Sequence, residues 1–335
     1  MLRFPAFGDL AQTFQRTAQM GQMKTAINRS TTETTTGLVH RTATHLTARN
    51  DSLVALEASL QRLDAYAQAR GAVNLRIDAV QSALEAIDDM SSALSVDLMN
   101  ATASAHAVTV DTLARDSATR FEATVGLLNG RLAERALFAG RAEAGPALRP
   151  AQQILDELQT VVAGAVSAAD VETLAGAWFD DPAGFAAFAY LGGDAAPGIP
   201  VSDTDNVAVP VTAADPALRD TLKGLAMAAL LDRGALAGLD AQRKDLAARA
   251  GQVLFAAGSD RTMLAASLGV VADRLDRIGT QGAAQRSGLE IARVGLIGVD
   301  PFASATRLQE AQRQLESVFA ITARMSRLNL MDFLR

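Results

Sequence analysis

The chain has 335 residues, of which 49% are hydrophobic and only 4% aromatic, with 31 lysines and arginines against 37 aspartates and glutamates. The high apolar content excludes intrinsic disorder as the main state. The net charge of −6, with no block of basic residues, argues against a nucleic-acid-binding protein. Because there is no cysteine, disulfides, thiolate chemistry and cysteine-ligated zinc are impossible.

The N-terminal residues do not follow the pattern of a secretory signal peptide. Residues 1–9 (MLRFPAFGD) contain no apolar central region, and a polar run follows them. No stretch approaches 18 uninterrupted apolar residues, so we expect no membrane span. We therefore expect a soluble chain which, if it leaves the cell, is exported without a cleaved signal peptide.

Residues 1–50 are predicted to form a terminal helix and a connector. A weak apolar stripe at helical spacing marks the helix at about 8–28. The threonine-rich run 31–36 (TTETTT) and the residues up to 51 are low in strong helix formers. We therefore expect a break or an extended connector at about 31–51.

Residues 51–144 are predicted to form a long helical hairpin. From Leu53 to Leu98 the apolar residues recur in steps of three and four, interrupted by a phase shift near 66–70, which is the pattern of a coiled-coil seam. A helix over about 52–103 is ~75–80 Å long at 1.5 Å per residue, longer than a compact core requires. A second helix is predicted at about 107–137, ending at the sequence Phe-Ala-Gly of 138–140.

Residues 145–215 differ from the rest in composition. They hold six of the nine prolines, with a seventh directly after them at 216, and a cluster of aromatic residues between Trp178 and Tyr190. We expect short helices at 151–166 and 170–178 and a small β-hairpin at 199–211. These features predict a small variable α+β module with its own core, which a flexible linker could replace.

Helical pattern returns at Asp215-Pro216, a helix-start signal. Residues 216–300 are predicted to form return helices at about 216–231, 238–257 and 260–298. After the break at 298–301 (GVDP), residues 301–335 are predicted to form a C-terminal helix. The fold class that follows is mainly α: an elongated bundle of long antiparallel coiled-coil helices built from both ends of the chain, with the small module inserted in the middle.

Both ends of the chain are predicted to be amphipathic helices, and an apolar stripe at a terminus must be buried. A monomer could fold the stripe back, and an assembly could bury it between subunits; because isolated helices of this length are marginal, we expect both ends to be poorly ordered in a dilute monomer. The candidate residues are Leu10, Phe14, Met20, Ile27, Leu308, Leu315, Val318, Met325 and Leu328.

No motif for catalysis, cofactor binding or metal binding is present in the sequence. The three histidines, His40, His45 and His106, do not have the spacing of a metal site and are interpreted as surface residues. The adjacent acidic pairs at 88–89 and 180–181 are interpreted as solvated. We therefore expect neither an enzyme nor a cofactor.

The order of these elements resembles the flagellin superfamily, and more closely the FlgL family of hook–filament junction proteins (hook-associated protein type 3) in its alphaproteobacterial form. The C-terminal stretches 300–317 and 324–334 (RMSRLNLMDFL) are the most specific. Further matching stretches are 8–12 (GDLAQ), 60–66 (LQRLDAY) and 137–141 (LFAGR). The threonine-rich stretch replaces the Asn/Asp-rich capping region of many relatives, a departure that argues against filament flagellin itself.

The resemblance implies an extracellular structural adaptor of the bacterial flagellum, polymerising between hook and filament. It implies self-association in a tubular assembly through the terminal stripes. The implied partners are the hook-side junction protein FlgK, flagellin, and the flagellar type III export machinery with its chaperone. The alternatives are a filament subunit of the flagellin type and a cytosolic helical signalling module.

Overall fold

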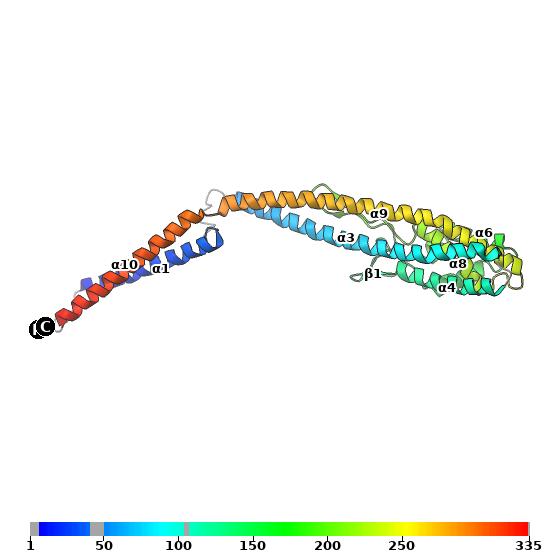
Figure 1. Ribbon diagram of the computed structural model, residues 1–335, viewed down its shortest axis with the longest axis horizontal. Coiled ribbons are helices and arrows are strands. Elements are labelled where there is room, and N and C mark those ends of the chain that lie inside the picture. Colours follow the sequence, from blue (N-terminus) through cyan, green and yellow to red (C-terminus); the bar gives the residue numbers. More distant parts are fainter. Residues whose placement is uncertain (1–6, 41–49, 104–106, 334–335) are drawn as a thin grey trace. The chain divides into compact units, whose positions relative to one another are not determined.

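The computed structural model describes residues 7–40, 50–103 and 107–333 (Figure 1). The chain divides into two units: unit 1 is Met1–Leu63 with Ala283–Arg335, and unit 2 is Asp64–Gly282. The division falls within the helices α3 (Asn50–Met99) and α9 (Asp240–Ile297). The prediction of a mainly α chain with long antiparallel helices and a small α+β segment is confirmed.

Unit 1 contains the two terminal helices, α1 (Phe7–Thr36) and α10 (Pro301–Phe333), which lie side by side. The expected break at 31–36 is wrong, because α1 continues through the threonine run. Within this run the hydroxyls of Thr34, Thr35 and Thr36 donate to carbonyls four residues earlier, at 2.7–2.8 Å. These local bonds and the packing against α10 outweigh the low helix propensity of threonine. Residues 41–49 of the expected connector lie outside the described residues.

Helix α3 buries the apolar seam that its sequence predicts, with Ile77, Val80, Ile87, Leu94 and Leu98 at most 1% exposed. Helix α9 runs antiparallel to α3 in unit 2. Gly251 of α9 lies against Ser95 of α3, whereas Arg261, later in α9, pairs with Asp88, earlier in α3. The predicted helix end near 257–260 is wrong: Gly258-Ser259 lies inside one continuous α9. A glycine inside a helix lowers helix stability by only about 1 kcal/mol relative to alanine. Burial of the neighbouring leucines, Leu254 and Leu268, offsets this loss.

Helix α4 (Ala107–Leu128) follows a short 3₁₀ turn, η1 (Asn100–Ala103), and ends nine residues before the predicted end. The prediction of helix to 137 is wrong because a hairpin replaces it: β1 (Arg131–Leu132) pairs with β2 (Arg135–Ala136). The side chain of Asn129 starts this departure by exchanging two hydrogen bonds with the backbone of Leu148, at 2.8 and 3.1 Å.

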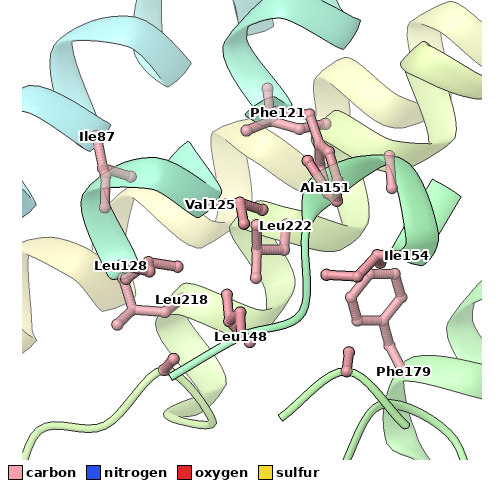
Figure 2. Close-up of a cluster of buried hydrophobic side chains, with 14 of the residues drawn as sticks. Ile87, Phe121, Val125, Leu128, Leu148, Ala151, Ile154, Phe179, Leu218 and Leu222 are labelled. Atoms are coloured by element: carbon pink, nitrogen blue, oxygen red, sulfur yellow. The ribbon is translucent and has the colours of Figure 1, made fainter. Parts of the chain in front are cut away.

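Helix α8 (Pro216–Asp232) is buried on nearly every side. It begins as predicted, with Asp215 accepting a hydrogen bond from the Ala217 amide and Pro216 in the first turn. Helices α4, α5 (Ala151–Val161) and α6 (Ala168–Asp180) pack around it. Figure 2 shows Val125 and Leu128 of α4 beside Leu222 and Leu218 of α8, and Phe179 of α6 beside Ile154 of α5. From Gly224 to Leu231 this helix carries no polar side chain, and a stretch that is apolar on every face requires such an enclosure.

The segment 145–215 contains the predicted short helices and the predicted hairpin. Besides α5 and α6 it holds α7 (Phe185–Phe188), and β3 (Ile199–Pro200) pairs antiparallel with β4 (Asn206–Val207). The aromatic cluster is core, as predicted: the ring of Trp178 meets those of Phe179 and Phe185 edge-on, at centroid distances of 5.1 and 6.1 Å.

The expectation that this segment has a core of its own requires correction. Its buried side chains belong to one hydrophobic cluster with those of α3, α4, α8 and α9. The physical reason is the enclosure of α8, which α5 and α6 complete. The change in composition at 145 and 215 marks where the local secondary structure changes. The hydrophobic core, however, continues across both positions.

Two glycines and one arginine fix how closely the long helices of unit 2 approach one another. A Cβ atom at Gly251 would lie 2.7 Å from the Ser95 carbonyl oxygen, and one at Gly224 would lie 2.7 Å from Leu254 Cγ. Arg261 is 2% exposed; it donates to Asp88 Oδ1 at 2.7 and 3.0 Å and to Thr221 Oγ1 at 2.8 Å. Arg261 therefore joins α3, α8 and α9 through charged hydrogen bonds in a largely apolar interior.

We expect Gly251→Ala to destabilise unit 2 by about 1–3 kcal/mol, because backbone atoms of α3 block the added methyl group. Gly269→Ala is the matched control in the same helix, since nothing lies within 4 Å of its Cβ position. It should stabilise by about 0.5–1 kcal/mol through helix propensity and a less flexible unfolded chain. Urea denaturation followed by circular dichroism measures both; equal effects would contradict the close approach.

Replacing residues 145–215 by a flexible linker is expected to abolish the cooperative thermal transition of unit 2, because α8 loses α5 and α6. Two point variants in the segment separate packing from chain length. Phe179→Ala, at a side chain 1% exposed, should cost about 3–5 kcal/mol. Val166→Ala, at a side chain 73% exposed, should change stability by less than about 0.5 kcal/mol. A linker variant that melts like the full chain would show that the segment is separable.

Candidate assembly surface

The apolar stripes of the two terminal helices face each other within the chain. Helices α1 and α10 run antiparallel, because residues near the end of α1 contact residues near the start of α10: Thr34 Oγ1 lies within hydrogen-bond distance of Ser304 Oγ, at 3.2 Å. Along α10, burial recurs in steps of four and three, the coiled-coil seam pattern. The seam positions with reduced exposure are 304, 308, 311, 315, 318 and 322 on α10, and 20, 23, 27, 30 and 33 on α1; 303 and 305, beside Ser304, are half-buried as well.

The structure places five of the predicted interface residues in this seam. Met20, Ile27, Leu308, Leu315 and Val318 are all half-buried. In contrast, Phe14 points away from the seam and is 81% exposed. Leu10, Met325 and Leu328 lie in α1 and α10, but their side chains are outside the described residues. From the sequence, each stripe could pack within the chain or against another subunit. In the structure the two stripes pack against each other within one chain.

Where the terminal helices meet α3 and α9, one short antiparallel backbone bridge between Leu38 and Gly298 closes unit 1. Gly37 ends α1 in the left-handed conformation, with φ of 70°, and its amide donates to the Glu33 carbonyl at 2.9 Å. The amide of Val39 then donates to the Ile297 carbonyl at 2.9 Å, and that of Val299 to the Gly37 carbonyl at 3.0 Å. We call residues 33–39 together with 297–307 the joint.

The break between α9 and α10 has the form that its sequence predicts. A Cβ atom at Gly298 would lie 2.4 Å from the Val294 carbonyl oxygen, so only glycine fits without a shift of the backbone. Asp300 Oδ1 accepts a hydrogen bond from the Phe302 amide at 2.9 Å, which caps the start of α10. A small apolar cluster of Leu53 and Ile297, with Leu38 packed on it, lies beside this bridge.

Glu33 is the buried charge of the joint, with its side chain 2% exposed. Its Oε1 accepts from Arg29 Nε at 2.9 Å and from the His40 amide at 3.2 Å, and Arg307 lies 3.7 Å from Oε2. Burial opposes ionisation of the carboxyl. The hydrogen bonds from Arg29 and the His40 amide and the two positive charges outweigh it, so the pKa of Glu33 lies below its ordinary value.

The sequence interpretation missed Glu33, which it treated as part of a helix-breaking threonine run. Two signals mark its position. Arg29 and Glu33 have the i,i+4 spacing of a helical ion pair, and Thr36-Gly37 is a helix C-terminus of the usual kind. The contact with Arg307, 274 positions along the chain, has no signal in the local sequence.

Large apolar side chains remain exposed on unit 1 outside the seam. On the helix pair these are Phe14, Phe302, Phe319 and Ile321, which are 81%, 81%, 48% and 57% exposed. On the last turns of α9, Ile291 and Val294 are 71% and 58% exposed. Exposed apolar surface of this kind is characteristic of protein–protein contacts.

The titratable residues singled out in the sequence form no metal site within residues 7–40, 50–103 and 107–333. The side chain of His40 is exposed, and His45 and His106 lie outside the described residues. Of the acidic pairs, Asp88 binds the buried Arg261, and Asp180 lies 3.1 Å from Arg219. Asp88 therefore has a structural role, whereas Asp180 is 60% exposed, as the interpretation of a solvated pair expects.

Residues 255–334 match the model of the bacterial flagellin C-terminal helical region, a match that begins within α9 and includes α10. A comparison of the chain with curated proteins finds no match. The matched region supports a place in the flagellin superfamily and a structural role in the flagellum. Among the helices whose residues are described, none has the length and apolarity to cross a membrane.

The joint is expected to weaken in acid. Because the pKa of Glu33 is lower in the folded chain than its ordinary value of about 4.5, its charge stabilises the joint above that pH. This stabilisation is lost as the pH falls through the folded pKa. Hydrogen exchange at the amides of Val39 and Val299, corrected for intrinsic rates, measures the opening of the joint.

Glu33→Gln should ease this opening by about 1–3 kcal/mol at pH 7 and flatten its pH dependence, because the buried position loses the charge that pairs with the half-exposed Arg29 and Arg307. The matched control is Glu290→Gln, at an exposed pair with Arg286, which should leave the two amides unchanged. Protection that responds equally to both substitutions would show that Glu33 does not hold the joint.

Proposed function

We propose that this chain is a structural subunit of the bacterial flagellum that serves as the hook–filament junction adaptor. The observation that carries the proposal is the match of residues 255–334 to the flagellin C-terminal helical region, since this part includes α10 of the antiparallel terminal pair. In this proposal α1 and α10 act as one pair, and the outer surface of the pair contacts neighbouring subunits.

The incomplete burial of the α1–α10 seam supports a role in assembly. Leu308, Leu315 and Val318 are only half-buried, although they lie at the centre of the contact between the two helices. Two helices alone cannot enclose an apolar core, and helix stability in proteins depends mainly on packing of the apolar face. Further helices from neighbouring subunits would complete this burial and cover Phe302 and Phe319.

Within this proposal the chain self-associates in a tubular assembly, with FlgK on the hook side and flagellin on the filament side. It reaches the distal end of the hook through the flagellar type III export machinery, accompanied by a chaperone. The stretch 324–334 and the sequence Phe-Ala-Gly at 138–140 favour the junction family over filament flagellin. The extracellular location follows from the same proposal.

Deletion of the gene in the source bacterium, followed by electron microscopy, tests the junction role. We expect hooks without filaments, and flagellin released into the medium. Re-expression of the full chain should restore filaments. Normal filament attachment in the deletion strain would contradict the proposal, and hooks without filaments and without released flagellin would favour a filament subunit.

Leu315→Asp is expected to abolish assembly while unit 2 remains folded. The substitution places an unpaired carboxylate in the seam, which costs several kcal/mol where water is excluded. Gln314→Asp, at the neighbouring exposed position, is the matched control and should assemble normally. Circular dichroism of the purified variants checks unit 2, and electron microscopy of complemented cells checks assembly; filaments attached in the Leu315 variant would exclude this residue from the interface.

A further inference from the structure

A groove on unit 2 combines arginine side chains with apolar walls, and the proposed assembly role does not use it. A cavity of about 450 Å³ lies between α3, the β1–β2 hairpin and the extended segments 196–200 and 207–209. A second hollow of about 180 Å³ adjoins it along α3 and shares four lining residues, Val73, Arg76, Arg135 and Ile199. The two hollows therefore form one continuous groove, with the hairpin beside it.

The polar lining of the groove carries more positive than negative charge. Arg76, Arg135 and Arg141 line it together with one carboxylate, that of Glu143. Glu143 accepts from Arg76 Nη1 at 2.6 Å and pairs with Arg135 through its other oxygen. This local excess is notable in a chain whose net charge is −6.

The arginines are not fully satisfied by the contacts of the described residues. Arg76 Nε is buried without a hydrogen-bond partner, although Nη2 donates to the Leu137 carbonyl at 3.1 Å. Arg141 is exposed, and its Nε makes a long contact of 3.4 Å with the Ala195 carbonyl. A planar guanidinium with unused donors binds a carboxylate well, since two parallel hydrogen bonds can form.

Apolar side chains flank the arginines on both sides. The walls include the buried side chains of Val73, Val207 and Val209, and the rim carries Leu75 and Ile199, which are 56% and 37% exposed. A small free anion would pair with the arginines but would leave this apolar rim in water. An extended chain with alternating apolar and acidic side chains would cover both, because its successive side chains lie at the spacing of a strand.

We propose that this groove is a docking site for an extended acidic peptide segment of a partner protein, with carboxylates on Arg141 and Arg135 and apolar side chains against Leu75 and Ile199. The charge complementarity and the length of the joined hollows distinguish this occupant from a simple anion.

Fluorescence anisotropy with a labelled hexapeptide of alternating valine and glutamate tests the site on the full chain. We expect binding that Arg141→Gln weakens by about tenfold, through loss of one charged hydrogen-bonding partner. Arg135→Gln is a second variant with the same expected direction, and circular dichroism confirms that both fold. The matched control is Arg115→Gln, an exposed arginine with the same kind of 3.4 Å carbonyl contact outside the groove, which should bind as the wild type does.

A hexapeptide of alternating valine and lysine should not bind, and equal binding of the two peptides would overturn the proposal. Unchanged affinity in both groove variants would overturn it as well. Free glutarate that displaces the acidic peptide at equal concentration would assign the site to a small acid instead. Concentration-dependent association in sedimentation that Arg141→Gln removes, without peptide binding, would assign the groove to a second copy of the chain.

Discussion

Helix α8 has no polar side chain from Gly224 to Leu231, so each of its faces must be covered before unit 2 can exclude water. Helices α4, α5 and α6 supply this cover. The proline-rich middle of the chain is therefore bound to the long helices by apolar burial, however different its composition. The aromatic cluster of α6 and α7 extends the same core outward and does not form a second one.

Burial alone does not set the register between long helices, since an alanine- and leucine-rich surface offers many similar alignments. In unit 2 two contacts fix the register, because each is possible only when the helices have one relative position along their axes. Gly251 admits the backbone of α3 at Ser95, and Arg261 reaches Asp88 and Thr221 from a position that is 2% exposed. A shift by one turn would bury the guanidinium without partners, at a cost of several kcal/mol.

Unit 1 is held in a different way. Its helix pair is half-buried, and its joint depends on one backbone bridge, a small apolar cluster and the ionised Glu33. A region that buries little apolar surface for its length opens more easily than a closed core. For a subunit that enters an assembly, this arrangement keeps the terminal helices paired while leaving apolar side chains such as Phe302 and Phe319 available to neighbours.

The sequence by itself determined the long helix α3, because its apolar steps of three and four fit only one face of a helix, and it located the start of α8 and the break at Gly298 through local capping chemistry. It also predicted the residues of the terminal stripes. Only the tertiary structure decided that these stripes pair with each other, that the threonine run stays helical, and that Glu33 meets Arg307. The reason is physical: periodicity and caps act within a few residues, whereas the partner of a buried face or charge is chosen by contacts between segments hundreds of positions apart.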